Sequence, residues 1–144
     1  MAALKQNFAG QPFKILAFPC NEFLHQEPGS NAVIETFAAG FGNFTMMAKS
    51  DVNSECQSSD AGQCAPASIE CCSANNAVYP YLKGVLPGKI SWNFNKFLVG
   101  KDGAPIKRYG TEDYADKMQA DITAALAHSE DAFGRQQGAV KDIS

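Results

Sequence analysis

The chain has 144 residues, of which 45% are hydrophobic and 19% charged, and its formal net charge is −3 at pH 7. A chain of this length and composition is typical of one ordinary globular domain with its own hydrophobic core. The acidic balance argues against a nucleic-acid-binding protein, because lysines and arginines are scattered along the chain and phosphate recognition needs a clustered basic field.

Apolar runs are short throughout the chain, and Lys, Asn or Gly interrupts each of them. None approaches the roughly 20 residues that a membrane-spanning helix needs. Residues 1–6 also lack the apolar core of a signal peptide. We therefore expect a cytoplasmic protein without a membrane span, although a targeting segment upstream of Met1 stays open.

The first part of the chain alternates between helical and strand-like patterns. Residues 2–8 indicate the end of a helix, and the mostly apolar run 13–18 indicates a buried strand that Pro19 ends. A turn then leads into a helix for which Asn31 is a plausible cap. The apolar face of that helix consists of Val33, Ile34, Phe37 and Ala38. Residues 44–48 form the next strand candidate.

The later part of the chain begins with a change of composition. Residues 54–76 are rich in Ser, Ala, Cys, Gln and Asn and show little periodicity, which indicates a long surface loop or insertion. A short helix over 77–83 follows. Residues 92–99 give the best strand pattern, and an Asp-Gly turn joins this strand to a returning strand over 104–109.

A last helix is predicted over 114–128, with an apolar face of Met118, Ile122, Ala125 and Leu126. Residues 129–144 are weakly patterned and are predicted to form a frayed tail, so we place the domain at 1–128. The resulting order of helices and strands predicts an α/β fold with one terminal antiparallel hairpin.

The chain has five cysteines, four of which lie within residues 56–72. An odd number without a secretory signal does not favour a structural disulfide framework. The spacing C-x7-C-x6-C-C matches no common zinc pattern. We therefore predict no metal site, and the two histidines have no visible ligand partners.

Two long motifs resemble a known family. Residues 15–23 read Ile-Leu-Ala-Phe-Pro-Cys-Asn-Glu-Phe and are followed at 26–31 by Gln-Glu-Pro-Gly-Ser-Asn. Residues 90–99 read Ile-Ser-Trp-Asn-Phe-Asn-Lys-Phe-Leu-Val, and Lys-Arg-Tyr follows at 107–109. Both motifs, in this order, resemble the glutathione peroxidase signatures. The resemblance implies a thioredoxin-like three-layer α/β sandwich.

The resemblance also implies three active-site residues, namely Gln26, Trp92 and Asn93. In the family they surround a peroxidatic cysteine or selenocysteine, which attacks peroxide as its anion. Amide NH2 groups and the indole N–H are hydrogen-bond donors that can stabilise this anion and help deliver a proton to the departing oxygen. No residue of this chain matches the peroxidatic position. Cys20 belongs to a separate family position and is predicted to be a packing residue.

In the family, the nucleophile follows a first, central strand that pairs with the strands predicted at 13–18 and 92–99. Nothing in this chain matches that strand, so we expect a fold that lacks it. Each buried backbone group left unpaired would cost about 1–3 kcal/mol. Our hypothesis is an incomplete gene model, in which a selenocysteine codon was taken as a stop. A degenerate paralogue is the rival account.

The implied function is reduction of hydrogen peroxide or of organic and lipid hydroperoxides by glutathione, in the response to oxidative stress. The resemblance is closest to the monomeric phospholipid-hydroperoxide type, with no bound cofactor. Thioredoxin stays open as reductant, but the helix that usually carries the resolving cysteine of thioredoxin-dependent members has none here. The alternative is a pseudo-peroxidase or redox-sensing interaction domain without the nucleophile. The insertion cysteines are either redox thiols or incidental loop residues; they are Cys56, Cys64, Cys71 and Cys72.

Overall fold

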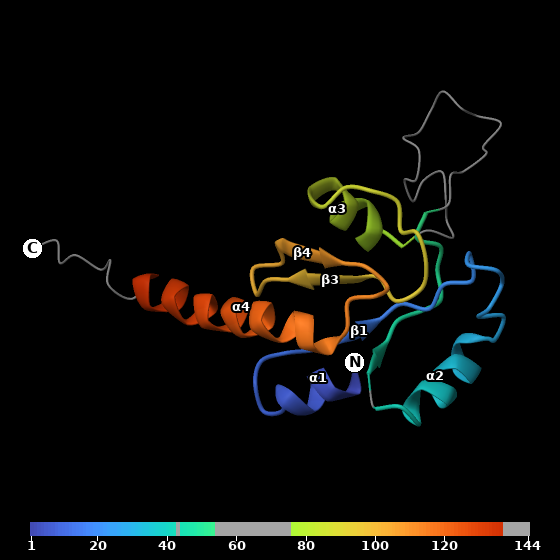
Figure 1. Cartoon of the computed structure of the whole chain (residues 1–144), viewed down its shortest axis with the longest axis horizontal. Coiled ribbons are helices and arrows are strands. Elements are labelled where there is room, and N and C mark those ends of the chain that lie inside the picture. The colour runs from blue at the N-terminus through green and yellow to red at the C-terminus, as the bar shows by residue number, and fades with distance from the viewer. Residues whose placement is uncertain (43, 54–75, 137–144) are drawn as a thin grey trace, which may run out of the picture.

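The computed structural model describes residues 1–42, 44–53 and 76–136, and Figure 1 shows their arrangement. The order of helices and strands is the predicted one. The elements are α1 (Ala2–Asn7), β1 (Leu16–Ala17), α2 (Asn31–Ala39), β2 (Thr45–Met46), α3 (Val78–Val85), β3 (Lys96–Val99), β4 (Pro105–Tyr109) and α4 (Ala115–Gln136). The four cysteines of the predicted insertion lie outside the described residues.

The strands form two separate sheets within the described chain. β1 and β2 are parallel, with Leu16 opposite Thr45, and α2 is the crossover between them. β3 and β4 form an antiparallel hairpin in which Lys96 lies opposite Tyr109. β1 and β3 are not paired with each other. This arrangement agrees with the prediction of an α/β fold that lacks a central strand between the two pairs.

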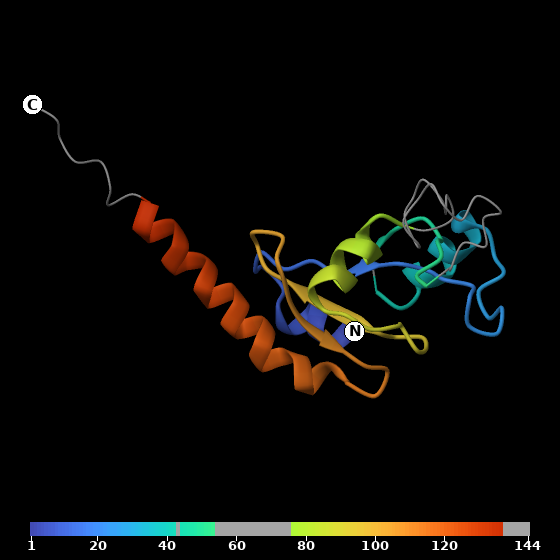
Figure 2. The same cartoon turned by 90° about the horizontal axis from the view of Figure 1, so that it is seen from above.

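The hairpin is the middle of three layers. Figures 1 and 2 show α3 over one face of β3 and β4, with α1 and α4 on the opposite face. The Tyr81 hydroxyl of α3 donates to the Gly103 carbonyl in the hairpin turn, at 3.0 Å. The core lies between α1, the hairpin and α4, and it consists of Leu4, Phe8, Leu98, Tyr109, Met118 and Ile122. The predicted apolar face of the last helix is therefore confirmed.

The predicted strand over 92–99 is wrong in its first half, because β3 begins only at Lys96. Phe94 has φ 57°, in the left-handed region that interrupts a strand. The Asn95 side chain donates to the Trp92 carbonyl at 2.8 Å, which closes a turn. Trp92 and Asn93 therefore lie on a turn that enters β3, where side chains need not alternate between two faces.

The region around α2 also differs from the sequence-based prediction. Ser30, and not Asn31, caps the helix, since its hydroxyl accepts from the Val33 amide. The Asn31 side chain instead accepts from the Lys49 amide at 2.9 Å. Of the predicted apolar face only Ile34 is buried, whereas Val33 and Phe37 are 60% and 69% exposed. Sequence periodicity identified apolar residues along one side of the helix, but it carries no information on whether another part of the fold covers them.

α4 continues past the predicted end at His128 to Gln136, so the segment predicted as a frayed tail begins as helix. The domain boundary at 128 stays a prediction. None of the helices described here is long and apolar enough to cross a membrane.

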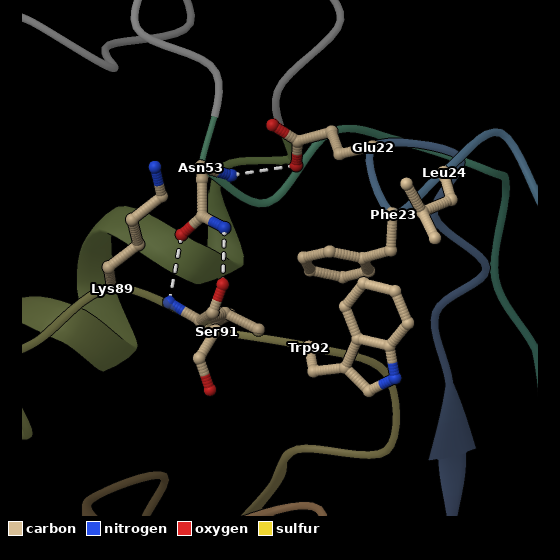
Figure 3. Close-up of a pocket in the computed structure, with 8 residues that line it drawn as sticks. Glu22, Phe23, Leu24, Asn53, Lys89, Ser91 and Trp92 are labelled. Carbon is tan, nitrogen blue, oxygen red and sulfur yellow. Dashed lines mark hydrogen bonds between the residues drawn. The ribbon is translucent and has the colours of Figure 1, made fainter.

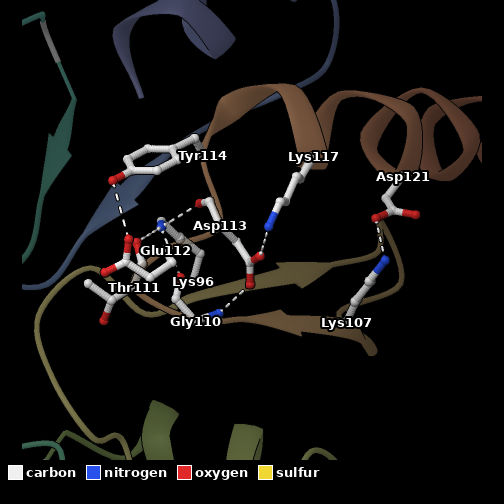
Figure 4. Close-up of polar contacts among 9 residues, drawn as sticks. All are labelled: Lys96, Lys107, Gly110, Thr111, Glu112, Asp113, Tyr114, Lys117 and Asp121. Carbon is white, nitrogen blue, oxygen red and sulfur yellow. Dashed lines mark hydrogen bonds and ion pairs between the residues drawn. The ribbon is translucent and has the colours of Figure 1, made fainter.

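Charged side chains fix the loop between β4 and α4, as Figure 4 shows. The Lys96 ammonium donates to three backbone carbonyls, those of Gly110, Thr111 and Asp113, at 2.7 to 3.3 Å. The Asp113 carboxylate accepts from the Gly110 amide at 2.8 Å and pairs with Lys117 at 3.0 Å. This loop carries Thr111, which reaches the candidate site.

Candidate functional site

Two of the three predicted site residues are in direct contact, although 67 positions separate them in the sequence. The Asn93 side-chain amide donates to the Gln26 side-chain carbonyl at 2.8 Å. A primary amide has two N–H donors and a carbonyl acceptor. This contact uses the carbonyl of Gln26 and so leaves the NH2 group of Gln26 to donate to another group. Trp92 precedes Asn93 on the same turn and is 39% exposed.

A tight loop before Gln26 sets its position. Leu24 and His25 both have φ 53°, in the left-handed region that non-glycine residues rarely adopt. Such a residue costs on the order of 1–3 kcal/mol and persists only where the surroundings hold it. Here the Asn21 side chain accepts from the Glu27 amide at 2.9 Å. The Gln26 amide donates to the Phe23 carbonyl at 3.3 Å, which closes the loop.

Trp92 packs against this loop through Phe23. The two ring centroids are 5.7 Å apart and the planes are tilted by 50°, a favourable geometry for an aromatic pair. Figure 3 shows the pair, with the indole nitrogen on the side of the ring away from Asn53. Beside the pair is a pocket of about 400 Å³, lined by Phe23, Leu24, Lys89, Ile90, Ser91 and Trp92 among others. Its size is within the range of small-molecule sites.

Backbone contacts hold the Trp92–Asn93 turn on both sides. The Thr111 hydroxyl donates to the Asn93 carbonyl at 2.7 Å. Upstream, the Arg108 guanidinium donates to the carbonyls of Gly88 and Lys89 at 2.8 and 2.7 Å. Because backbone carbonyls are the acceptors, these contacts fix the path of the chain and not only its side chains.

Cys20 lies close to the loop but does not have the properties of a nucleophile. Its thiol donates to the Glu22 carboxylate and accepts from the Glu22 amide, both at 3.4 Å. Burial, with a smaller contribution from the charge of Glu22, raises the pKa of the Cys20 thiol to about 11. The thiol is therefore protonated at neutral pH, and the thiolate is the reactive form. This supports the prediction that Cys20 is a packing residue.

The described residues contain no group of three or more His, Cys, Asp or Glu side chains that could hold a metal ion. The predicted redox cysteines lie outside the described part of the chain, so their role stays a prediction.

Sequence reasoning missed several residues that support the site. Asn53, Arg108 and Thr111 all contact the backbone between residues 87 and 93. Asn53 lies in an Asp-Val-Asn stretch, and Arg108 in the Lys-Arg-Tyr stretch, so both belonged to recognisable motifs. Thr111 had no such signal, because only the folded loop brings it to Asn93.

Comparison with known proteins identifies the family. The sequence profile described as "Glutathione peroxidase" matches residues 1–60. The chain is 38% identical to "Probable glutathione peroxidase 5" of Arabidopsis thaliana over 133 residues, which cover 88% of this chain and 66% of that protein. It is 38% identical to the "Phospholipid hydroperoxide glutathione peroxidase" of Sus scrofa over 124 residues, or 85% and 57% of the two chains.

A solved structure gives the same result for the fold. The protein described as "Crystal structure of Trgpx in apo form" superposes with a TM-score of 0.56 at 26% identity, covering 87% of this chain and 64% of that one. The chain thus spans between 57% and 66% of the length of the three proteins compared here. On this sequence and structural similarity, the chain belongs to the glutathione peroxidase family.

Proposed function

We propose that this chain is the larger part of a peroxidase that reduces hydrogen peroxide or organic and lipid hydroperoxides with glutathione. The observation that carries the proposal is the Asn93–Gln26 hydrogen bond beside Trp92. This contact joins two segments that the family motifs mark separately, and it brings two side-chain amides together on the loop against which Trp92 packs. Such donors are useful where a thiolate or selenolate must be stabilised.

In the proposed reaction a peroxidatic thiolate or selenolate attacks one oxygen of the hydroperoxide, and the O–O bond breaks. The departing oxygen takes a proton and leaves as water or an alcohol, while the nucleophile becomes a sulfenic or selenenic acid. One glutathione condenses with this acid and releases water. A second glutathione then displaces the first as glutathione disulfide and restores the nucleophile.

The residues of this chain have distinct roles in the proposal. The NH2 group of Gln26 and the indole N–H of Trp92 are the donors that we assign to the anion. Asn93 orients Gln26 through its own amide, and it keeps a second N–H for the peroxide oxygen. No residue of the chain matches the peroxidatic position, so the proposal places that residue on a segment upstream of Met1.

Glutathione is favoured over thioredoxin as the reductant. Thioredoxin-dependent relatives are expected to carry a resolving cysteine in the helix before the second strand, and α2 contains no cysteine. The pseudo-peroxidase alternative is not favoured, since the relatives compared here are named as peroxidases.

The first experiment is to read the native transcript upstream of the Met1 codon and to express both forms of the protein. We expect an in-frame Asn-Val-Ala-Ser-Cys/Sec-Gly-like segment. The longer form should consume NADPH in an assay coupled through glutathione reductase, whereas the 144-residue chain should show almost no turnover. In the longer form, Gln26→Ala and Asn93→Ala should each lower kcat by roughly 100-fold, as loss of one oxyanion donor does.

Either of two results would contradict the proposal. Robust turnover by the 144-residue chain would show that the nucleophile is already present in it. A folded longer form that contains Cys or Sec but turns over no hydroperoxide would favour the non-catalytic alternative.

A further inference from the structure

A network of hydrogen bonds connects the Gln26 loop (residues 21–27) to the Trp92 turn (residues 92–95) without passing through Gln26 or Trp92. At its centre is Asn53, which follows β2. Its side-chain amide donates to the Ile90 carbonyl at 2.7 Å, and its side-chain carbonyl accepts from the Ile90 amide at 2.9 Å. Ile90 is 4% exposed, so the Asn53 side chain satisfies two backbone groups that have little access to water.

The backbone of Asn53 is itself held by the Gln26 loop. One oxygen of the Glu22 carboxylate accepts from the Asn53 amide at 2.9 Å and from the amide of Val52. Val52 is buried, and its carbonyl accepts from the Lys83 ammonium at 2.7 Å. Figure 3 shows the contacts from Glu22 to Asn53 and from Asn53 to the chain between Lys89 and Ser91. A carboxylate that accepts from backbone amides makes hydrogen bonds stronger than those between neutral groups.

This network acts on the backbone close to Trp92, whereas the Asn93–Gln26 hydrogen bond joins side chains only. Gln26 is exposed, and a single side-chain bond between exposed groups is worth only about 1 kcal/mol. The Asn53–Ile90 pair instead acts on the backbone two residues before Trp92. Glu22 lies four residues before Gln26 on its loop.

We propose that Asn53 is a positioning residue that sets Trp92 and Asn93 at their distance from the Gln26 loop, with Glu22 as its anchor. The inference rests on the proposed function in so far as the geometry serves catalysis. The structural half of the inference, that Asn53 sets the orientation of the Trp92 indole, does not rest on the proposed function. It can be tested in the chain alone.

The test uses the fact that Trp92 is the one tryptophan of the chain, so intrinsic fluorescence reports on this side chain only. Asn53→Ala removes both hydrogen bonds, and Asn53→Asp keeps the shape of the side chain but loses the donor to Ile90. Both variants should shift the emission to longer wavelength, lower its anisotropy and increase quenching by acrylamide. Tyr109→Phe is the matched control, because it removes a 2.7 Å hydrogen bond to Asp121 elsewhere in the fold.

Two outcomes overturn the structural half. One is tryptophan emission in both Asn53 variants that is the same as in the unsubstituted chain. The other is an equal change in Tyr109→Phe, which would indicate general loosening. If the Asn53 variants fail to fold, amide hydrogen exchange of the unsubstituted chain decides, because the Ile90 amide must be protected. Rapid exchange at Ile90 in the folded chain contradicts the proposal.

The catalytic half is measured in the longer, peroxidase-competent form. Asn53→Ala should lower kcat by about 10- to 100-fold, the scale expected for misplacement by about 1 Å, while KM for glutathione stays within about twofold. A fall in kcat no greater than in Tyr109→Phe would refute this half. If the unsubstituted longer form is inactive, the proposed function fails, and the fluorescence result still decides the role of Asn53.

Discussion

Single side chains near the site have chemistry that follows from their surroundings. Cys20 illustrates this, because a cysteine adjacent to a family motif is an obvious candidate for reactivity. Its half-buried thiol faces the Glu22 carboxylate, and burial and the negative charge both favour the protonated form. The same carboxylate organises the backbone of Val52 and Asn53. One acidic residue therefore adds to the effect of burial on the pKa of the thiol and also anchors a hydrogen-bond network.

Alkylation provides a direct check on Cys20. The pKa of its thiol is raised from 9.0 to about 11, so at pH 7.5 the thiolate fraction is lower by roughly 100-fold than in the unfolded chain. We expect iodoacetamide to label Cys20 at least that much more slowly in the native chain than in urea, as measured by peptide mass spectrometry. Equal labelling rates in the two conditions would show that the thiol is neither buried nor raised in pKa.

At the scale of elements, the Asp113 carboxylate connects the β4–α4 loop at Gly110 to Lys117 in α4. The pKa of its carboxyl is lowered below 3.8, first by the hydrogen bond from the Gly110 amide and second by Lys117. A group with a lowered pKa in the folded state stabilises the fold above its unfolded pKa, and this stabilisation is lost as the pH falls through the folded value. The β4–α4 loop should therefore contribute to acid sensitivity.

This leads to a prediction for Asp113→Asn. The urea midpoint of the unsubstituted chain should fall as the pH is lowered from about 5 to about 2. The urea midpoint of the variant should fall less steeply over the same range. Far-UV circular dichroism measures both. Asp116→Asn is the control, since it removes the same charge three residues further on, in the first turn of α4. If the control flattens the pH dependence as much as Asp113→Asn, the Gly110–Asp113–Lys117 contacts are not the cause.

Sequence patterns predicted the element order, the hairpin and the buried face of α4, because each of these depends on local periodicity or turn chemistry. The motifs also indicated Gln26, Trp92 and Asn93. Patterns could not predict that Trp92 lies on a turn, since the left-handed backbone of Phe94 is not encoded by residue type. They also could not identify Thr111 or the role of Asn53, which depend on contacts between segments distant in sequence.

At the scale of the whole molecule, the principal core lies on one side of the hairpin. Leu4 and Ile122, which are 0% and 1% exposed, join α1 to α4 at its centre. The β1–α2–β2 unit belongs to the other sheet and contributes few buried side chains. Stability of the chain should therefore depend strongly on the contact between its first and last helices.

Ile122→Ala tests this dependence. Removing a buried isoleucine side chain costs about 2–5 kcal/mol, a large share of the 5–15 kcal/mol that a domain normally has. We expect a marked fall in the urea midpoint, followed by circular dichroism at 222 nm, a wavelength that reports roughly on helix content. Thr123→Ala, at an exposed neighbouring position, should change stability by no more than about 0.5 kcal/mol. Equal effects of the two substitutions would contradict a core centred on Ile122.

The exposed aromatic rings at the end of α2 and just after it have a practical consequence for laboratory work. Phe37 and Phe41 are 69% and 62% exposed, and their rings lie 5.0 Å apart. Environment-sensitive dyes become fluorescent on exposed apolar surface, so the folded chain itself will give them a signal. A dye-based thermal melt will then start from a high baseline and show a small transition. Comparisons of variants of this chain are better made with its own tryptophan or with circular dichroism.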